Sequence, residues 1–411
     1  HTDATTKFSS EMTEACNSMK FMLALIALLC CLLRGVAFST LRLSSCALKR
    51  TPTAGKSQFL RLNSASPASV GIDLGTTYSL VSLLENGRPK ILKVDGKPTM
   101  PSVVSYLPNG RVVVGQAARD LDATNPLNTF TSIKRVMGKS LEYIQKMREK
   151  VFTSKIQKKA PASPSDPHAH LFCPALQSNL SPEQVSAEIL RKLVSVAERH
   201  LIERDGAIEG YPMGKRVTKA VITVPAYFDQ LQREATIRAG KLIGLEKVKL
   251  LREPEAAALA YGLNLHVPQL VLVFDLGGGT LDVSALEVGG GVVEVIATNG
   301  DAHLGGDDFD AVIVEHVLDQ FAQVPGVTQE IISSVRGDPA VLATLRATAE
   351  EAKRNLSSVQ QVTINCPALH KGSGLGVSVG LTRRRFETLS TSLLYRLLQP
   401  VRELAIQAQC I

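Results

Sequence analysis

The sequence predicts a duplicated α/β fold in two lobes, because one strand–turn–strand pattern occurs twice along the chain. Apolar and β-branched residues at 70–74 lead into a turn with glycine and threonine, and a second strand is expected over 78–84. The pattern returns at 271–276, followed by a turn at 277–279 with three consecutive glycines and a strand over 281–286. A chain of 411 residues is long enough for two such halves, each with its own core.

The two turns carry residue types that suit a phosphate group. Glycine removes side-chain bulk so that backbone N–H groups can approach phosphate, and threonine hydroxyls add further donors. Asp73 and Asp275 stand at the ends of the strands, where each could hold a hydrated cation beside that phosphate. One such hairpin would be weak support, but two imply halves that clamp one nucleotide in a cleft. The pattern is neither a Walker A motif nor a Rossmann fingerprint, since no Gly-Lys-Ser/Thr occurs and no helix is expected after the glycines.

Most of the excess positive charge lies near the amino terminus. The net charge is +8, and residues 1–68 contribute +5 of it through eight basic and three acidic side chains. The remainder of the chain is nearly balanced, so its charge predicts no nucleic-acid partner. The seven cysteines have no C-x-x-C spacing, which makes a disulfide framework or a zinc site an unsuitable interpretation.

The first 68 residues are interpreted as mainly a targeting sequence. Residues 1–18 precede the first suitable methionine and are read as upstream or fragment sequence. Residues 19–37 contain 13 consecutive apolar side chains between a lysine and an arginine, which is typical of a signal peptide. Residues 38–68 are acid-free, basic and serine-rich, like a transit peptide. Together they resemble the bipartite presequence of algae with complex plastids and predict the plastid stroma; a plain signal peptide with a linker would instead place the protein in the endoplasmic reticulum lumen.

The hairpins and several further motifs resemble the Hsp70 chaperones, whose ATPase domain shares its fold with actin and the sugar kinases. The resemblance predicts a nucleotide-binding domain over 69–411, with lobe I at about 69–263 and lobe II at about 264–411. Residues 173–175 and 185–193 are most similar to the bacterial and plastid branch. The other matching stretches are 129–135, 221–228, 253–262, 298–301, 303–310 and 350–358.

The resemblance also implies the chemistry of the site, with ATP or ADP, Mg²⁺ and nearby K⁺ as cofactors. Lys134 would orient and polarise the attacking water, and Glu253 would accept hydrogen bonds from metal-bound waters. The implied catalytic residues are Lys134, Glu253, Asp275, Thr280 and Asp73, of which Asp73, Glu253 and Asp275 would hold Mg²⁺ through water. The implied nucleotide-binding residues are Gly75, Thr76, Thr77, Tyr78, Gly277, Gly278, Gly279, Thr280, Gly305, Gly306, Glu350, Lys353, Arg354 and Ser357.

Three further roles follow from the same resemblance. Pro225 and Arg233 would relay the nucleotide state to a substrate domain, and Asp282 would either be catalytic or cap its hairpin. Glu350, Lys353, Arg354 and Ser357 are spaced as one face of a single helix. The implied partners are unfolded polypeptide clients, a J-domain co-chaperone and a nucleotide exchange factor, with no nucleic acid and no membrane for the mature form.

The chain departs from the family pattern in several places. Arg252 and Glu255 flank the catalytic Glu253-Pro254, where the family usually has asparagine and threonine. The segment 140–173 looks divergent and loop-like. The chain ends inside an expected helical stretch, 384–409, so we expect a nucleotide-binding domain that is incomplete at its carboxyl end, with no peptide-binding domain.

Two other functions fit parts of the pattern. A short ATPase-only relative would act as a regulator rather than as a chaperone. A sugar or small-metabolite kinase on the same fold would need a base aspartate beside a sugar pocket, and no such signature accompanies the hairpins. An ATP-driven chaperone for unfolded polypeptides is therefore the favoured interpretation.

Overall fold

The computed structural model describes residues 68–140, 170–205, 217–261 and 267–408. The upstream and targeting segments predicted over 1–68 lie outside these ranges except for Ala68, which begins a strand. Most of the divergent segment 140–173 lies outside them too. Within them, no helix is long and apolar enough to span a bilayer.

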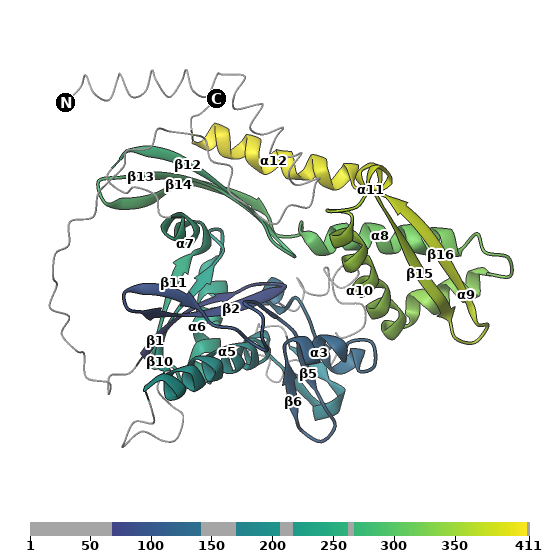
Figure 1. Ribbon diagram of the computed structural model, residues 1–411, viewed down its shortest axis with the longest axis horizontal. Coiled ribbons are helices and arrows are strands. Elements are labelled where there is room, and N and C mark those ends of the chain that lie inside the picture. Colours follow the sequence, from purple (N-terminus) through teal and green to yellow (C-terminus); the bar gives the residue numbers. More distant parts are fainter. Residues whose placement is uncertain (1–67, 141–169, 206–216, 262–266, 409–411) are drawn as a thin grey trace.

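The first lobe is built on a mixed sheet with strand order β11-β10-β1-β2-β3 (Figure 1). Strand β1 pairs in parallel with β10, which pairs in parallel with β11, whereas β2 and β3 continue the sheet antiparallel on the other side of β1. A further short strand, β4, pairs with β2. The bounds are β1 (Ala68–Leu74), β2 (Tyr78–Glu85), β3 (Arg88–Ile91), β4 (Met100–Pro101), β10 (Val217–Val224) and β11 (Lys247–Arg252).

Helices α5 (Pro182–Asp205) and α6 (Gln230–Leu242) pack against each other and against the strands of this sheet. Alternate residues of a strand point to one face, so Val70, Ile72 and Leu74 of β1 all enter the core that these helices cover. Ile189 and Leu193 of α5 belong to the same buried cluster. This core fixes the direction in which β1 delivers its turn to the site.

A smaller outer unit of the first lobe carries the segment that contains Lys134. It consists of β5 (Val104–Tyr106), β6 (Val112–Val114), α3 (Gln116–Asp120), η1 (Pro126–Asn128), β7 (Thr129–Phe130), η2 (Ile133–Val136), β8 (Leu171–Cys173), η3 (Pro174–Leu176) and β9 (Ser178–Leu180). Phe130, just before η2, is fully buried and stacks edge-on against Tyr106 at 5.8 Å between ring centroids. The aromatic contact anchors the 3₁₀ turn that presents Lys134.

The second lobe begins with an antiparallel sheet of β12 (Gln269–Leu276), β13 (Leu281–Gly289) and β14 (Val292–Asp301). Figure 1 shows helix α12 (Thr391–Gln407) on one side of this sheet and α7 (Glu253–Ala260) on the side that faces the first lobe. Phe274, Val283 and Ala285 form a core with Leu397 and Val401 of α12. Because α7 contacts β10 and β11 as well as β12 and β14, it is the layer between the two sheets.

The outer unit of the second lobe is a helical layer on a two-stranded sheet. It contains α8 (Gly306–Phe321), α9 (Gln329–Gly337), α10 (Pro339–Asn355), β15 (Gln361–His370), β16 (Leu375–Thr382) and α11 (Arg383–Leu389). Asp338 begins α10 by accepting hydrogen bonds from the N–H groups of Ala340 and Val341, in front of a proline at the first helical position. Leu318 and Phe321 of α8 and Leu345 of α10 pack in a separate buried cluster.

Three sequence predictions need correction. The helical stretch expected over 384–409 is two helices, because the backbone breaks at Ser390 between α11 and α12. Ser357 lies in a turn beyond the end of α10, so it does not share one helix with Glu350. Residues 171–173 form strand β8 and not a loop. The predicted boundary near residue 263 falls in the undescribed range 262–266 and stays a prediction.

Candidate functional site

The turn at the end of β1 and the turn at the end of β12 meet face to face. A Cβ atom added to Gly278 would overlap the Thr77 side chain, and one added to Gly279 would overlap the Arg135 side chain. A Cβ atom on Gly305 would likewise overlap the backbone of Gly278 and Gly279. Only glycine allows these approaches, so contact with the first lobe explains Gly278 and Gly279, and contact with the glycine turn explains Gly305.

A buried hydroxyl where the two turns meet is available to bind a ligand. The Thr77 hydroxyl is buried, and within the described part of the chain its oxygen has no hydrogen-bond partner. A buried hydroxyl of this kind normally finds a partner. A phosphate oxygen would supply one, which agrees with the predicted role of Thr76 and Thr77 and with Thr280 on the facing turn. These residues fit the terminal phosphates of a nucleotide.

Lys134 and Glu253 form a nearly buried ion pair within the first lobe. Lys134 projects from η2 with 9% of its side chain exposed, and its Nζ atom lies 2.6 Å from Oε1 of Glu253, the first residue of α7. Burial opposes the charge of Lys134, but the carboxylates of Glu253, Asp73 and Asp275 outweigh it and raise the lysine pKa. Lys134 is therefore a permanent cation.

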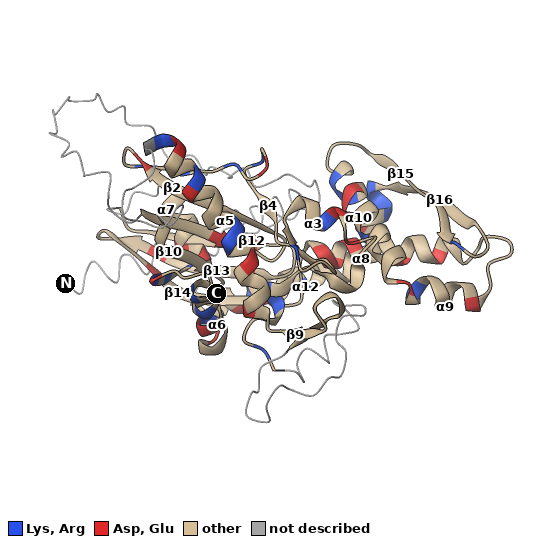
Figure 2. Ribbon diagram, turned by 90° about the horizontal axis from the view of Figure 1, so that it is seen from below, with Lys and Arg blue, Asp and Glu red and all other residues tan. Residues whose placement is uncertain are grey.

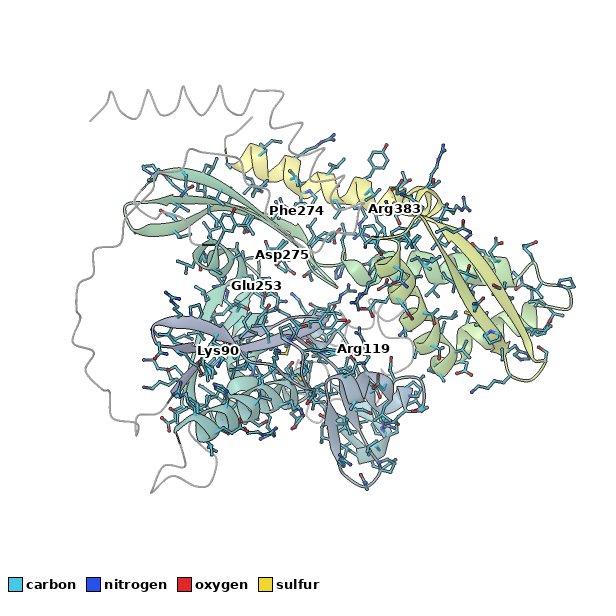
Figure 3. All side chains as sticks on the ribbon, in the orientation of Figure 1. Lys90, Arg119, Glu253, Phe274, Asp275 and Arg383 are labelled. Carbon is cyan, nitrogen blue, oxygen red and sulfur yellow. The ribbon has the colours of Figure 1, made fainter. Side chains whose placement is uncertain are left out.

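The same centre holds more negative than positive charge. Burial raises the pKa of Glu253 to about 7, although Lys134 opposes the shift, and the charge of Asp73 adds to it. Burial also raises the pKa of Asp275, followed by repulsion from Asp282, its direct neighbour across β12 and β13. Figure 3 shows Glu253 and Asp275 between the two sheets. Burial is thus the main cause of the high carboxyl pKa values and neighbouring carboxylates add to it, whereas the high lysine pKa comes from the carboxylates alone.

A hydrated divalent cation fits this centre. The three predicted carboxylates with Lys134 carry two excess negative charges, which Mg²⁺ would neutralise, and Mg²⁺ usually keeps several of its waters. Among the described residues, no cluster of three or more His, Cys, Asp or Glu side chains is spaced for direct metal ligation. Binding through water, as the sequence predicts for Asp73, Glu253 and Asp275, does not require such a cluster.

Asp282 connects the two lobes. Its Oδ2 atom accepts a hydrogen bond of 2.8 Å from the backbone N–H of Ala226, at the end of β10. Its Oδ1 atom accepts bonds from the hydroxyls of Ser284 and Thr298. The sequence left open whether Asp282 is catalytic or caps its hairpin; in the structure its oxygens hold the hairpin against the first lobe.

Pro225 and Arg233 lie at this same junction. The guanidinium of Arg233 donates to the backbone carbonyls of Phe228 at 2.9 Å and Ala226 at 3.5 Å. Arg233 therefore holds the segment after Pro225 in place, beside the hydrogen bond from the Ala226 N–H to Asp282. The relay role of the two residues stays a prediction.

The other predicted ligands line the side of the cleft toward α10. The backbone N–H of Gly306 donates to the carbonyl of Gly277, which joins the start of α8 to the glycine turn. Lys353 donates to the carbonyl of Gly306 at 2.8 Å and pairs with Asp310 at 2.8 Å, where burial raises the aspartate pKa to about 6. Arg354 is exposed at the end of α10. Gly306 and Lys353 are thus brought to the hairpins.

Two contacts bridge the mouth of the cleft that the sequence analysis did not find. Arg119 of the first lobe pairs with Glu350 of α10 at 2.9 Å and donates to the Tyr78 hydroxyl, which itself donates to Glu350. Arg135, with 3% of its side chain exposed, lies 3.4 Å from Asp308, and Ser132 donates to Asp307. Figure 2 shows positive and negative segments close together where α3 faces α10. Arg135, Asp307 and Asp308 lie within the family-like stretches 129–135 and 303–310. The sequence does not show that residues so far apart in the chain form ion pairs.

The unusual residues around Glu253 form a local pair. The carboxylate of Glu255 accepts a bond from the backbone N–H of Arg252 at 3.3 Å and lies 3.4 Å from its guanidinium. Glu255 therefore closes the first turn of α7 in the manner of a capping box. The two departures from the family pattern compensate each other at the residue that presents Glu253.

The fold and the site define a two-lobed nucleotide-binding domain with its two glycine-containing turns at the contact between the lobes. The Hsp70 protein family model matches residues 69–411, and the chain belongs to the Hsp70 family. The predicted actin-like fold is confirmed by this match.

Curated relatives of plastid and cyanobacterial type agree with this assignment. A "Chaperone protein dnaK" of Cyanidioschyzon merolae is 41% identical over 344 residues, which cover 83% of this chain and 53% of the relative. A relative of the same name in Cyanidium caldarium is 42% identical over 81% of this chain and 50% of its own length. One from Prochlorococcus marinus is 43% identical over 81% of this chain and 49% of its own length. The chain spans about half the length of the curated relatives it matches.

We predict that Gly305→Ala displaces the start of α8 from the glycine turn at 277–279. The added methyl group would overlap the backbone of Gly278 and Gly279, which should lower the free energy of unfolding by about 1–3 kcal/mol and weaken nucleotide binding. Gly337→Ala is the matched control, because an added Cβ there meets no atom within 4 Å. Urea denaturation and nucleotide titration of both variants measure the difference. Equal behaviour of the two variants would contradict the steric explanation.

We predict a pH dependence of stability from Glu253 in the nucleotide-free protein. Its pKa is 4.5 in an ordinary environment and about 7 when folded, so the folded state binds more protons between these values. Stability must then fall as the pH rises from about 5 to about 7, by on the order of 2 kcal/mol. Glu253→Gln should remove this slope, and Glu246→Gln, at an exposed position, should keep it. Parallel slopes in denaturation curves of all three proteins would refute the assignment.

Proposed function

We propose that the protein binds ATP with Mg²⁺ between its lobes and hydrolyses it, and that hydrolysis drives chaperone binding and release of unfolded polypeptides. The observation that carries the proposal is the buried ion pair of Lys134 and Glu253 beside the two glycine turns. A cation held at the phosphate end of the cleft, with carboxylates around it, suits phosphoryl transfer, which depends on positioning and charge stabilisation.

The residues divide the work by position. Thr76, Thr77 and the glycine turn at 277–279 would bind the phosphates through hydroxyl and backbone N–H donors, as oxyanion donors do elsewhere. Asp73, Glu253 and Asp275 would hold hydrated Mg²⁺, with K⁺ nearby. When bound, Mg²⁺ supplies positive charge to the β- and γ-phosphate oxygens.

Lys134 would orient the attacking water. Its raised pKa keeps it protonated, so it donates hydrogen bonds and cannot act as a base. The water oxygen would bond to the γ-phosphorus as the bond between that phosphorus and the β,γ-bridging oxygen breaks, so that this oxygen leaves with ADP. Of the two water protons, one stays on the attacking oxygen and the other moves to another oxygen of the product phosphate. The ammonium stabilises the negative charge that spreads over the phosphoryl oxygens in the transition state.

The chaperone cycle rests on the relatives' printed name and on the part of their length that this chain does not span. On that ground we propose unfolded polypeptides as clients, with a J-domain co-chaperone and a nucleotide exchange factor as partners. Pro225 and Arg233 would relay the state of the cleft to a substrate domain, since they brace the junction held by Asp282. The plastid and cyanobacterial type of the relatives supports the plastid stroma as the compartment.

We expect Lys134→Ala to abolish hydrolysis while nucleotide binding persists. Loss of a preorganised cation at a developing charge costs roughly 100- to 1,000-fold in rate, whereas the phosphate turns remain. Single-turnover hydrolysis measured by acid quench, with fluorescent nucleotide titration in parallel, separates the two effects. Lys192→Ala is the control, because Lys192 forms an exposed ion pair with Asp95 in the same lobe. Normal single-turnover rates for Lys134→Ala would rule out the role of Lys134.

A further inference from the structure

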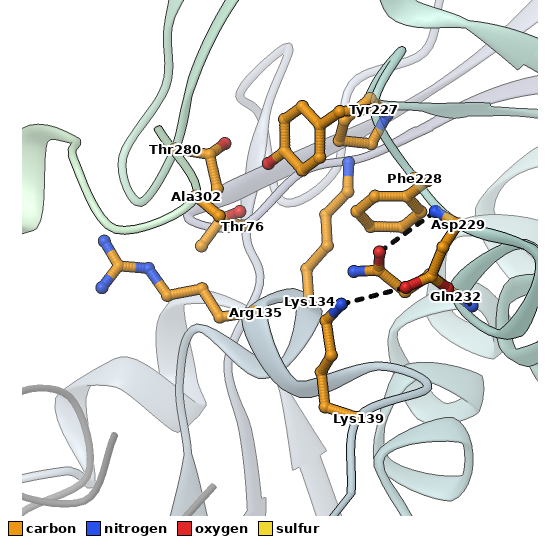
Figure 4. Close-up of a pocket in the computed structure, with 11 residues that line it drawn as sticks. Thr76, Lys134, Arg135, Lys139, Tyr227, Phe228, Asp229, Gln232, Thr280 and Ala302 are labelled. Atoms are coloured by element: carbon orange, nitrogen blue, oxygen red, sulfur yellow. Dashed lines mark hydrogen bonds and ion pairs between the residues drawn. The ribbon is translucent and has the colours of Figure 1, made fainter. Parts of the chain in front are cut away.

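A cavity of about 140 Å³ opens beside the phosphate-binding turns (Figure 4). On this measure one water molecule needs only about 10–15 Å³, so the space can hold a hydrated oxyanion. Its lining combines residues of the phosphate end of the cleft with residues of the η2 and α6 segments. Those used in the argument are Thr76, Lys134, Thr280, Lys139, Asp229 and Gln232.

The lining favours an anion. Lys134, Arg135 and Lys139 all border the cavity, against one carboxylate, that of Asp229. Each cation has a carboxylate partner, but Glu253 and Asp308, which pair with Lys134 and Arg135, are not among the lining residues. The lining side chains therefore comprise three cations and one carboxylate, whereas the carboxylates that surround Lys134 are not among them.

A partly exposed ion pair borders the cavity. Lys139 lies 3.1 Å from Oδ2 of Asp229, and 52% of the aspartate side chain is exposed, so water weakens this ion pair. The other oxygen of Asp229 accepts the bond from the backbone N–H of Gln232 that caps α6. Lys139 can thus leave Asp229 without uncapping the helix.

The route through the cleft mouth is closed by stronger contacts. The pair of Arg119 and Glu350 joins the lobes at 2.9 Å, with both side chains less than a third exposed. Tyr78 adds a hydrogen bond to Glu350 and a cation–π contact of 5.3 Å with Arg119. Departure of ADP toward α10 would require these contacts to break, whereas the cavity borders the phosphate turns directly.

We propose that inorganic phosphate leaves through this cavity while the lobes stay closed over ADP, with Lys139 as a cation in its lining. The inference rests on the proposed ATP hydrolysis for the source of the phosphate. On this proposal Lys139, Asp229 and Ala302 line the path by which phosphate leaves. These three residues take no part in the step that breaks the phosphate bond. Phosphate release and ADP release are then separate events with separate barriers.

The test measures binding and release of radiolabelled inorganic phosphate with the protein saturated by Mg²⁺ and ADP. Lys139→Ala removes positive charge and should weaken phosphate binding, whereas Asp229→Asn removes negative charge, keeps an N-cap oxygen and should strengthen it. We expect shifts of about three- to tenfold in opposite directions, which shrink at high ionic strength. Lys192→Ala and Asp95→Asn repeat the same charge changes at another exposed pair and should have no effect.

Two further variants distinguish this route from the cleft mouth. Ala302→Leu narrows the cavity and should slow phosphate release at least fivefold while ADP release is unchanged. Arg119→Ala opens the mouth and should speed ADP release but not phosphate release. The proposal is overturned if phosphate release is unchanged in Ala302→Leu, or if Arg119→Ala speeds both products equally. Acid-quench hydrolysis of ATP by each variant is measured separately, so a failure of hydrolysis is distinguishable from a failure of the phosphate route.

Discussion

The close approach of two glycine-containing turns is the constraint on which the rest of the site depends. Gly278 and Gly279 lie against side chains of the first lobe, and Gly305 lies against the backbone of both. Because Gly278 and Gly279 have no Cβ atom, the ends of β1 and β12 can approach each other closely. That contact in turn gathers Asp73 and Asp275 near the Lys134–Glu253 pair. The Thr77 hydroxyl at the same contact has no hydrogen-bond partner among the described residues.

The contact between the turns also explains why several carboxylates lie close together around Lys134. Burial, with added repulsion from neighbouring carboxylates, disfavours the charged forms of Glu253 and Asp275 when no metal ion is bound and raises the pKa of both. Such a centre gives up stability for function, a common balance at active sites. Mg²⁺ with nucleotide would remove the repulsion, so closure of the lobes and binding of the ligand support each other.

Much of the half of the site formed by the two glycine turns could be predicted because its determinants are local in the chain. The turns with Gly75 and Gly277 are visible as strand–turn–strand patterns, and the strands lie within three residues of the predicted bounds. The end of α10 was misjudged, since helical spacing through Ser357 says nothing of where backbone hydrogen bonding stops. The break at Ser390 was missed for the same reason.

The sequence by itself determined the two hairpins, the aspartates at their strand ends and the family to which the residues belong, because these features are short-range patterns of backbone propensity and side-chain type. Only the tertiary structure decided which distant charges meet. Arg119 finds Glu350, Arg135 finds Asp308, and Asp282 binds the backbone of Ala226. Such pairings depend on the packing of two lobes across a cleft, and no local periodicity encodes a contact between residues so far apart in the chain.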